Sequence, residues 1–193
     1  MKTSIGVIFF VILVGVILLW GGDIFSPQTP DPSPSSSPSS VEEGFEVYHN
    51  EELGITVWSP LGASIQPERE NIVKMTFLGP DNEPYTEITD GFTVTFRKDL
   101  NAQEYTSLDM YAQSVLEADM LEGEESLQET TIGLSYEAFM YTRPSELGNL
   151  VTTYITLPQE GVGYQISYSI TDPHQRGYQE IVTTILNSLQ FTS

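Results

Sequence analysis

The sequence predicts an α+β domain in which helices pack on a central antiparallel sheet of about six or seven strands, preceded by one transmembrane helix. Strand-like segments follow one another at short turns, which favours antiparallel pairing. Two amphipathic helical segments interrupt these strands, as is typical of α+β domains. A third observation, an apolar run at the start of the 193-residue chain, predicts the transmembrane helix.

The N-terminal segment is long and apolar enough to span a bilayer. Every residue from Ile5 to Trp20 is apolar or glycine, and extension to Phe25 gives about 20 residues, near the length that crosses a ~30 Å hydrocarbon layer. Lys2 precedes the run and acidic chain follows, so the positive-inside rule predicts a cytoplasmic N-terminus. We expect residues 1–25 to anchor the protein in the cell membrane as a single-pass helix.

A cleaved signal peptide is the alternative for this segment. Cleavage needs small residues at and two positions before the cut. Gly21, Gly22 and Ser26 are small, but the residues two positions before them are bulky. The sequence therefore favours retention of the helix.

Residues 26–44 are predicted to form a linker. Proline and serine dominate them, and such a composition buries too little apolar surface to build a core. A Pro-rich chain extends by about 3.1 Å per residue, so this segment could hold the following domain on the order of 50 Å from the bilayer. The folded domain is then expected over residues 45–193, outside the membrane.

Four strands are expected before the first helix, because β-branched and aromatic residues alternate with polar ones between turn residues. In the fourth strand, Phe92, Val94 and Phe96 share one face, which predicts that this face points into the core. The four strands are expected at residues 45–50, 54–60, 72–80 and 91–99.

The period then changes to that of a helix. Ser107 is an N-cap residue, and an apolar stripe follows it to about Leu121. A short strand at 127–132 and three longer strands come next. The last helix is predicted over residues 178–191, where Ile181, Ile185 and Leu189 recur every fourth residue. The three longer strands are expected at residues 135–143, 150–157 and 162–170.

The charge balance excludes some classes of partner. The chain has 27 acidic and 7 basic residues, a net charge of -20. This charge repels phosphate backbones, so we expect no binding to nucleic acid. The acidic charge indicates a solvated surface, and the alternative is that it binds cations or a basic partner. The absence of cysteine excludes disulfides, thiolate metal sites and a cysteine nucleophile.

Three stretches together resemble the PsbP-like domains, over Phe45 to Phe191. They are EVYHNEELGITVWSP near the start, YEAFMYTRP with LVTTYITLPQEGVGYQISYSIT later, and ILNSLQF at the end. One departure is that Trp58 precedes Pro60, whereas the family often places a tryptophan soon after this proline. The chain looks like a membrane-anchored prokaryotic member of the superfamily.

The resemblance implies a fold and a type of function. It implies an α/β/α sandwich with a central antiparallel sheet, and a domain that acts by binding. The best-known member of the family is an extrinsic subunit of photosystem II, and a relative binds the GTPase Ran. The chain has no twin-arginine thylakoid signal, so a photosynthetic role is not supported. No binding residue can be carried over by motif.

The candidate metal ligands are Asp172 and His174, which lie beside a predicted turn. A metal site needs three or four converging ligands, so acids from elsewhere would have to complete it. The alternative is that His174 and the other histidine, His49, are solvated turn residues. Loose calcium binding near residues 81–90 is a further possibility, although the spacing of its acids does not match a calcium loop.

No catalytic residue and no cofactor are predicted. There is no G-x-S-x-G motif, no Gly-rich phosphate loop, and no histidine with a suggestive neighbour. We therefore expect a non-catalytic binding or accessory domain, anchored in the membrane and acting on a protein partner. The alternative is a surface hydrolase, which would need two carboxylates facing one cleft, at least one of them in an apolar setting.

Overall fold

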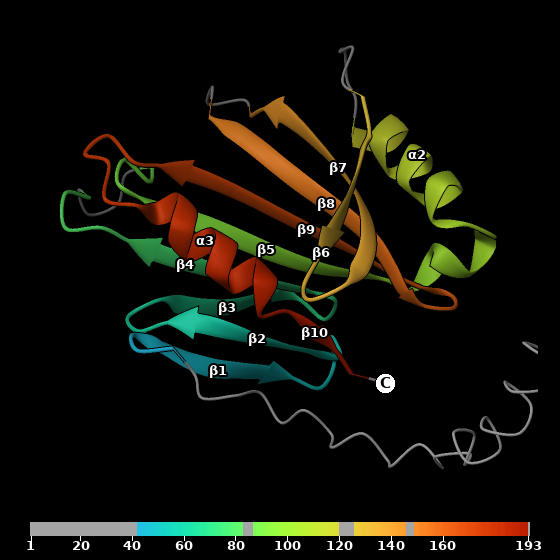
Figure 1. Cartoon of the computed structure of the whole chain (residues 1–193), viewed down its shortest axis with the longest axis horizontal. Helices are drawn as coiled ribbons and strands as arrows, with labels where there is room; N and C mark the ends of the chain where they lie inside the picture. Colours follow the sequence, from blue (N-terminus) through green and yellow to red (C-terminus); the bar gives the residue numbers. More distant parts are fainter. Residues whose placement is uncertain (1–41, 83–86, 120–125, 146–148, 193) are drawn as a thin grey trace, which may run out of the picture. The chain divides into compact units, whose positions relative to one another are not determined.

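The computed structural model describes residues 42–82, 87–119, 126–145 and 149–192 (Figure 1). The predicted transmembrane helix and most of the predicted linker lie outside these residues. In the described part of the chain, no helix has the length and apolar character needed to cross a membrane.

The described residues form ten strands, two α-helices and one 3-10 helix, in an order close to the predicted one. The strands before the first helix are β1 (Phe45–Asn50), β2 (Ile55–Pro60), β3 (Ser64–Arg69), β4 (Ile72–Leu78) and β5 (Gly91–Asp99). The elements that follow are η1 (Leu100–Glu104), α2 (Leu108–Asp119), β6 (Gln128–Ile132), β7 (Tyr136–Pro144), β8 (Leu150–Gln159), β9 (Val162–Thr171), α3 (Tyr178–Asn187) and β10 (Gln190–Phe191).

The strands form two antiparallel sheets. The larger sheet has seven strands in the order β3-β4-β5-β9-β8-β7-β6, and the smaller has the order β1-β2-β10. The predicted α+β class, the antiparallel sheet of about seven strands and the two helices are confirmed. The expectation of one central sheet is wrong for the first two strands, because β1 pairs with β2, and β2 pairs with β10 on its other side.

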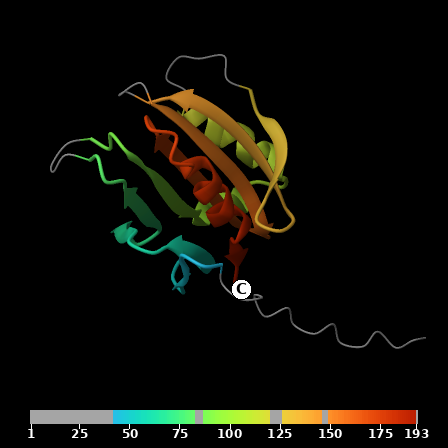
Figure 2. The same ribbon diagram turned by 60° about the vertical axis from the view of Figure 1, so that its left-hand side comes forward.

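The two helices lie on opposite faces of the seven-stranded sheet (Figures 1 and 2). Alternate residues of each strand of this sheet therefore point either to the side of α3 or to the side of α2. Phe92, Val94 and Phe96 of β5 are buried on the face that carries α3 and β2, as predicted. Tyr141 of β7 and Ile155 of β8 are buried on the other face, under α2.

The helix ends follow from local chemistry. The Ser107 hydroxyl accepts a hydrogen bond from the backbone N–H of Met110 at 3.3 Å, which confirms the predicted N-cap of α2. The last helix ends at Asn187 rather than at residue 191, because the Ser188 hydroxyl donates to the carbonyl of Ile185 and accepts from the N–H of Trp58. The chain then pairs with β2 as β10.

Strand β3 was not predicted, because Pro67 and the charged residues Glu68 and Arg69 break the strand-like alternation. Proline has no N–H for a ladder and is tolerated at the edge of a sheet. β3 occupies such an edge, next to β4 only.

The hydroxyl of Tyr164 joins β9 to the turn between β1 and β2. It donates a hydrogen bond of 2.5 Å to the carbonyl of Leu53, which is itself fully buried. Burial raises the pKa of Tyr164 to about 12, because the phenolate would lose its hydration.

We expect Leu189→Ala to lower the free energy of unfolding by about 2–5 kcal/mol, because it opens a cavity in the core next to α3. Leu189 has no exposed surface, whereas the control residue Leu134 is 81% exposed. Leu134→Ala should change stability by less than about 0.5 kcal/mol. Urea unfolding followed by circular dichroism measures both, and equal effects of the two variants would contradict the described core.

The raised pKa of Tyr164 predicts alkaline sensitivity. An unfolded tyrosine has a pKa of about 10, so the folded state holds this proton more tightly. The contribution is complete below pH 10 and is lost as the pH rises from about 10 to about 12. Tyr164→Phe should therefore flatten the fall in stability over this range, measured by urea unfolding at a series of pH values. An unchanged slope would show that Tyr164 does not titrate as described.

Candidate functional site

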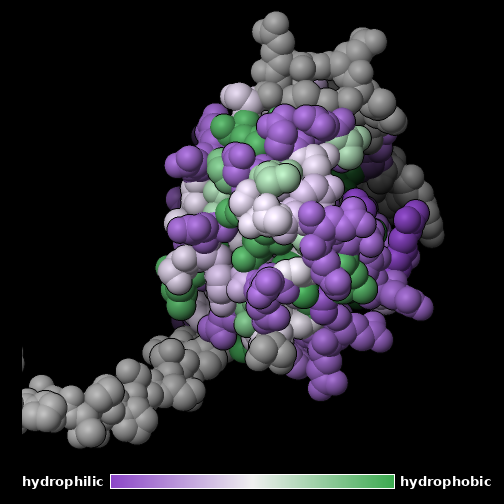
Figure 3. All heavy atoms as spheres, turned by 90° about the vertical axis from the view of Figure 1, so that its right-hand side faces the viewer, coloured by the Kyte–Doolittle hydropathy of each residue, from purple (hydrophilic) through white to green (hydrophobic). Residues whose placement is uncertain are grey.

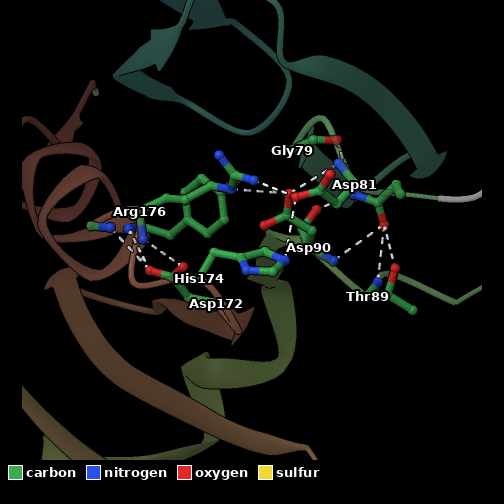
Figure 4. Close-up of polar contacts among 10 residues, drawn as sticks. Gly79, Asp81, Thr89, Asp90, Asp172, His174 and Arg176 are labelled. Atoms are coloured by element: carbon green, nitrogen blue, oxygen red, sulfur yellow. Dashed lines mark hydrogen bonds and ion pairs between the residues drawn. The ribbon is translucent and has the colours of Figure 1, made fainter.

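Two loops that are distant in the sequence meet through a polar cluster (Figure 4). One loop joins β4 to β5 and contributes Gly79, Asp81 and Asp90. The other joins β9 to α3 and contributes His174 and Arg176. We call these residues the loop clasp.

Asp90 is the buried centre of the loop clasp, with a side chain only 1% exposed. Its Oδ2 atom accepts from the N–H of Asp81 at 3.2 Å and lies 3.4 Å from the Nε atom of Arg176. The Tyr178 hydroxyl is hydrogen-bonded to the same side chain, and burial together with this carboxylate raises the pKa of Tyr178 to about 12. Gly79 is required here, because a Cβ atom at residue 79 would collide with Asp90 and Tyr178.

Arg176 neutralises both aspartates of the clasp. Its Nη2 atom donates to Oδ2 of Asp81, which also lies 3.3 Å from Nε2 of His174. The guanidinium thus occupies the space between the two carboxylates. Because a buried charge without a partner is strongly destabilising, this arrangement fixes the two loops against each other.

The carboxylate of Asp172 binds backbone N–H groups at the start of α3. It accepts from the backbone N–H groups of Arg176, Gly177 and Tyr178 at 2.7 to 3.3 Å. Partial burial raises the pKa of Asp172, but these three donors outweigh it, so that the pKa lies below its ordinary value.

The two candidate metal ligands, Asp172 and His174, bind different partners in the structure. Asp172 faces the backbone of α3, and His174 faces Asp81. Among the described residues, no three His, Asp or Glu side chains converge as a metal site. His49, the other histidine, lies on β1 and is hydrogen-bonded to the Thr56 hydroxyl at 2.9 Å.

A second polar region surrounds the end of β5. Arg97, Asp99 and Asn101 line a groove of about 490 Å³ against α2, and they also line a groove of about 580 Å³ on the side of Glu70 and Asn71. Arg97 is exposed and forms no ion pair with any residue that the structure describes. It is therefore available to a ligand from either groove.

The groove against α2 opens onto the polar side of the large sheet. α2 packs on β7 and β8, so the same face of β4, β5 and β9 is left with half-buried polar side chains. In register, Thr76 lies beside Thr93, which lies beside Ser169, and Lys74 lies beside Thr95, which lies beside Ser167. We call this surface the open face: Lys74, Thr76, Thr93, Thr95, Arg97, Gln165, Ser167 and Ser169.

Two buried tyrosines fix carboxylates at the border of this groove. The Tyr111 hydroxyl donates to Asp99 at 3.4 Å, and the Tyr141 hydroxyl donates to Asp119 at 2.5 Å. Burial, strengthened by the neighbouring carboxylate, raises the pKa of both tyrosines. Both therefore stay protonated as donors at neutral pH. Arg143 adds an ion pair of 3.5 Å to Asp119.

The predicted requirement of a hydrolase is met only in part. Asp81 and Asp90 lie close together and Asp90 is buried, but Arg176 contacts both. Asp99 and Asp119 line one groove, where each is already hydrogen-bonded by a tyrosine. A general acid needs a carboxyl that is free to hold and transfer a proton, whereas the carboxylates in both places are already engaged by arginine or tyrosine side chains.

The side of the domain that carries α2 is mostly hydrophilic, with apolar residues in small separate groups (Figure 3). Arg97 had not been singled out from the sequence. The signal that could have found it is a cation that shares its strand face with Thr93 and Thr95, opposite the apolar face of β5.

Comparison with known proteins adds likeness of fold only. No family model matches the sequence, and no curated protein matches it. A solved structure from Bacteroides thetaiotaomicron has 13% sequence identity and a TM-score of 0.46, over 78% of this chain and 49% of that one. The chain thus spans about half the length of that protein.

Two smaller proteins are similar over nearly their whole length. The Ran-binding protein Mog1p of Saccharomyces cerevisiae has 8% identity and a TM-score of 0.46, over 77% of this chain and 96% of that one. LpqN of Mycobacterium tuberculosis, described as involved in cell envelope biogenesis, has 16% identity and a TM-score of 0.47, over 77% and 91%. Membership of the PsbP-like family stays a prediction.

We expect Arg176→Met to lower the midpoint of urea unfolding, because it leaves Asp90 buried without a counter-charge. The control is Arg69→Met, which removes an exposed arginine of β3 that forms no ion pair with a described residue.

Adding Asp90→Asn to the Arg176→Met variant should recover part of the loss, since the unpaired charge is then gone. A double-mutant cycle of the four proteins measures this coupling. Additive effects would show that the two side chains do not act as a pair.

Proposed function

We propose that this protein is a non-catalytic binding module, displayed outside the cell membrane on an N-terminal anchor and a Pro/Ser-rich linker. The observation that carries the binding role is Arg97, an exposed cation between two grooves that forms no ion pair with a described residue. Three of the six cations that the structure describes, Lys74, Arg143 and Arg176, have a carboxylate partner. Arg97 has none among the described residues and, unlike the other unpaired arginine, Arg69, it lines two grooves. An arginine left without a carboxylate partner is suited to a ligand.

The anchor and the outside location rest on the sequence. The apolar run at residues 5–20, the single Lys2 before it and the acidic chain after it support an N-terminus in the cytoplasm. Protease added to intact cells should then remove the domain while cytoplasmic proteins stay whole. Detergent, but not high salt, should release the intact protein from membranes.

We expect the ligand to be a protein. Substitution of a groove residue tests whether the groove binds it. Arg97→Ala should weaken capture of the partner from solubilised membranes at least about tenfold, which corresponds to about 1.4 kcal/mol. Arg69→Ala is the matched control, because it removes an exposed arginine outside both grooves. Equal loss in the two variants would point to net charge rather than to the groove.

Hydrolysis is the competing function, and an activity assay on the same solubilised membranes would detect it. A surface hydrolase would turn over a substrate and would lose activity when Asp99 or Asp119 is changed to asparagine. Turnover without a stable partner would refute the binding role. Capture without turnover would support it.

A further inference from the structure

We propose that the open face binds a polyhydroxylated chain, a neutral polysaccharide or oligosaccharide, with the Arg97 groove at one end of the binding surface. This inference rests on the proposed binding function and adds a second class of ligand to the expected protein partner. The side chains of β4, β5 and β9 that face away from α3 form this surface.

The open face is unusual in this chain because of its charge. The protein has 27 acidic residues, yet the charges at the open face balance locally: Lys74 is paired with Glu68 of β3 at 3.5 Å, and Asp99 follows Arg97 on the same face of β5. A basic partner would find better complements elsewhere on the acidic surface. Nucleic acid would be repelled by the charge of the whole domain before it reached two cations. With basic partners and nucleic acid excluded, a neutral polar ligand is the class that fits the open face.

The chemistry of the open face matches sugar hydroxyls. A serine or threonine hydroxyl donates one hydrogen bond and accepts two, as a sugar hydroxyl does. The hydroxyls of Thr93 and Ser169 lie 3.0 Å apart, and those of Thr153 and Ser167 lie 2.9 Å apart. The pair of Thr93 and Ser169 is thus held in place by one bond and keeps further donor and acceptor capacity for a ligand, whereas in the second pair Thr153 is buried and Ser167 alone belongs to the open face. The guanidinium of Arg97 and the amide of Gln165 add planar donors.

The geometry suits an extended ligand. Side chains on one face of a strand repeat every two residues, about 6.6–6.8 Å, and neighbouring strands lie about 4.8 Å apart. Thr93, Thr95 and Arg97 follow one another at this spacing on β5, beside Ser169, Ser167 and Gln165 on β9. The rigid ladder fixes these groups before binding, which limits the entropy lost when a flexible chain docks.

The test is binding of the full-length protein in detergent to neutral hexasaccharides of glucose, N-acetylglucosamine and mannose, measured by isothermal titration. The double variant Thr93→Val with Ser169→Ala keeps the shape of the open face but removes one hydroxyl pair. The matched control is Thr142→Val with Thr152→Val, which removes a hydroxyl pair of 2.9 Å on the opposite face of the same sheet.

We expect saturable binding of at least one hexasaccharide, weakened at least about tenfold by the open-face variant and unchanged by the control. Binding should change little between low and high salt, because neutral ligands are not screened. If the open-face variant does not fold, Arg97→Met with Gln165→Ala replaces it. Absence of saturable binding to all three sugars, equal affinity of variant and wild type, or a steep salt dependence would overturn the inference.

The inference and the proposed function can fail separately. If a protein partner is captured and its capture needs Arg97, while no hexasaccharide binds, the ligand class is wrong and the binding function stands. If the protein binds neither a partner nor a sugar, both are wrong.

Discussion

The pairing of β5 with β9 is the constraint on which both faces of the large sheet depend. It joins residues 91–99 to residues 163–171, two segments that are far apart in the sequence. It also places the two strands in the middle of the seven-stranded sheet. Because side chains alternate, this register sends Phe92, Val94 and Phe96 towards α3 and leaves Thr93, Thr95 and Arg97 on the opposite side. A slip by one residue would bury the hydroxyls and expose the phenylalanines. The core and the open face are therefore two results of one register.

The loop clasp depends on the same pairing. β5 begins directly after Asp90, and β9 ends directly before Asp172, so their antiparallel register brings the β4–β5 loop and the β9–α3 loop to one end of the sheet. Arg176 can then reach both Asp81 and Asp90. The ion pairs fix loops that the sheet has already brought close. The side chain of Asp90 is then buried among the partners that the two loops bring to it, Arg176, Tyr178 and the backbone of Asp81.

Most of the fold could be predicted from the sequence because its signals are local. The alternation in β5, the Ser107 cap and the stripe of α2 all lie within a few residues of the elements that they specify. The elements that were missed depend on distant partners. β3 contains Pro67 and is a strand because β4 offers it an edge, and β10 forms because Ser188 meets Trp58 of β2. The clasp is of the same kind, since Asp81 and Arg176 lie 95 residues apart. Asp172 and His174 were noticed for their chemistry, but their partners could not be read from the chain.

Pro67 has a consequence for contacts between copies of the domain. Sheet edges present unpaired backbone groups, and neighbouring copies can join through them into longer sheets. β3 forms one edge of the large sheet, and Pro67 in its middle has no N–H to offer to another chain. Together with Glu68 and Arg69, it keeps this edge from extending into its neighbours. Copies of the domain at high concentration would then remain separate along this edge, each with its own polar surface free.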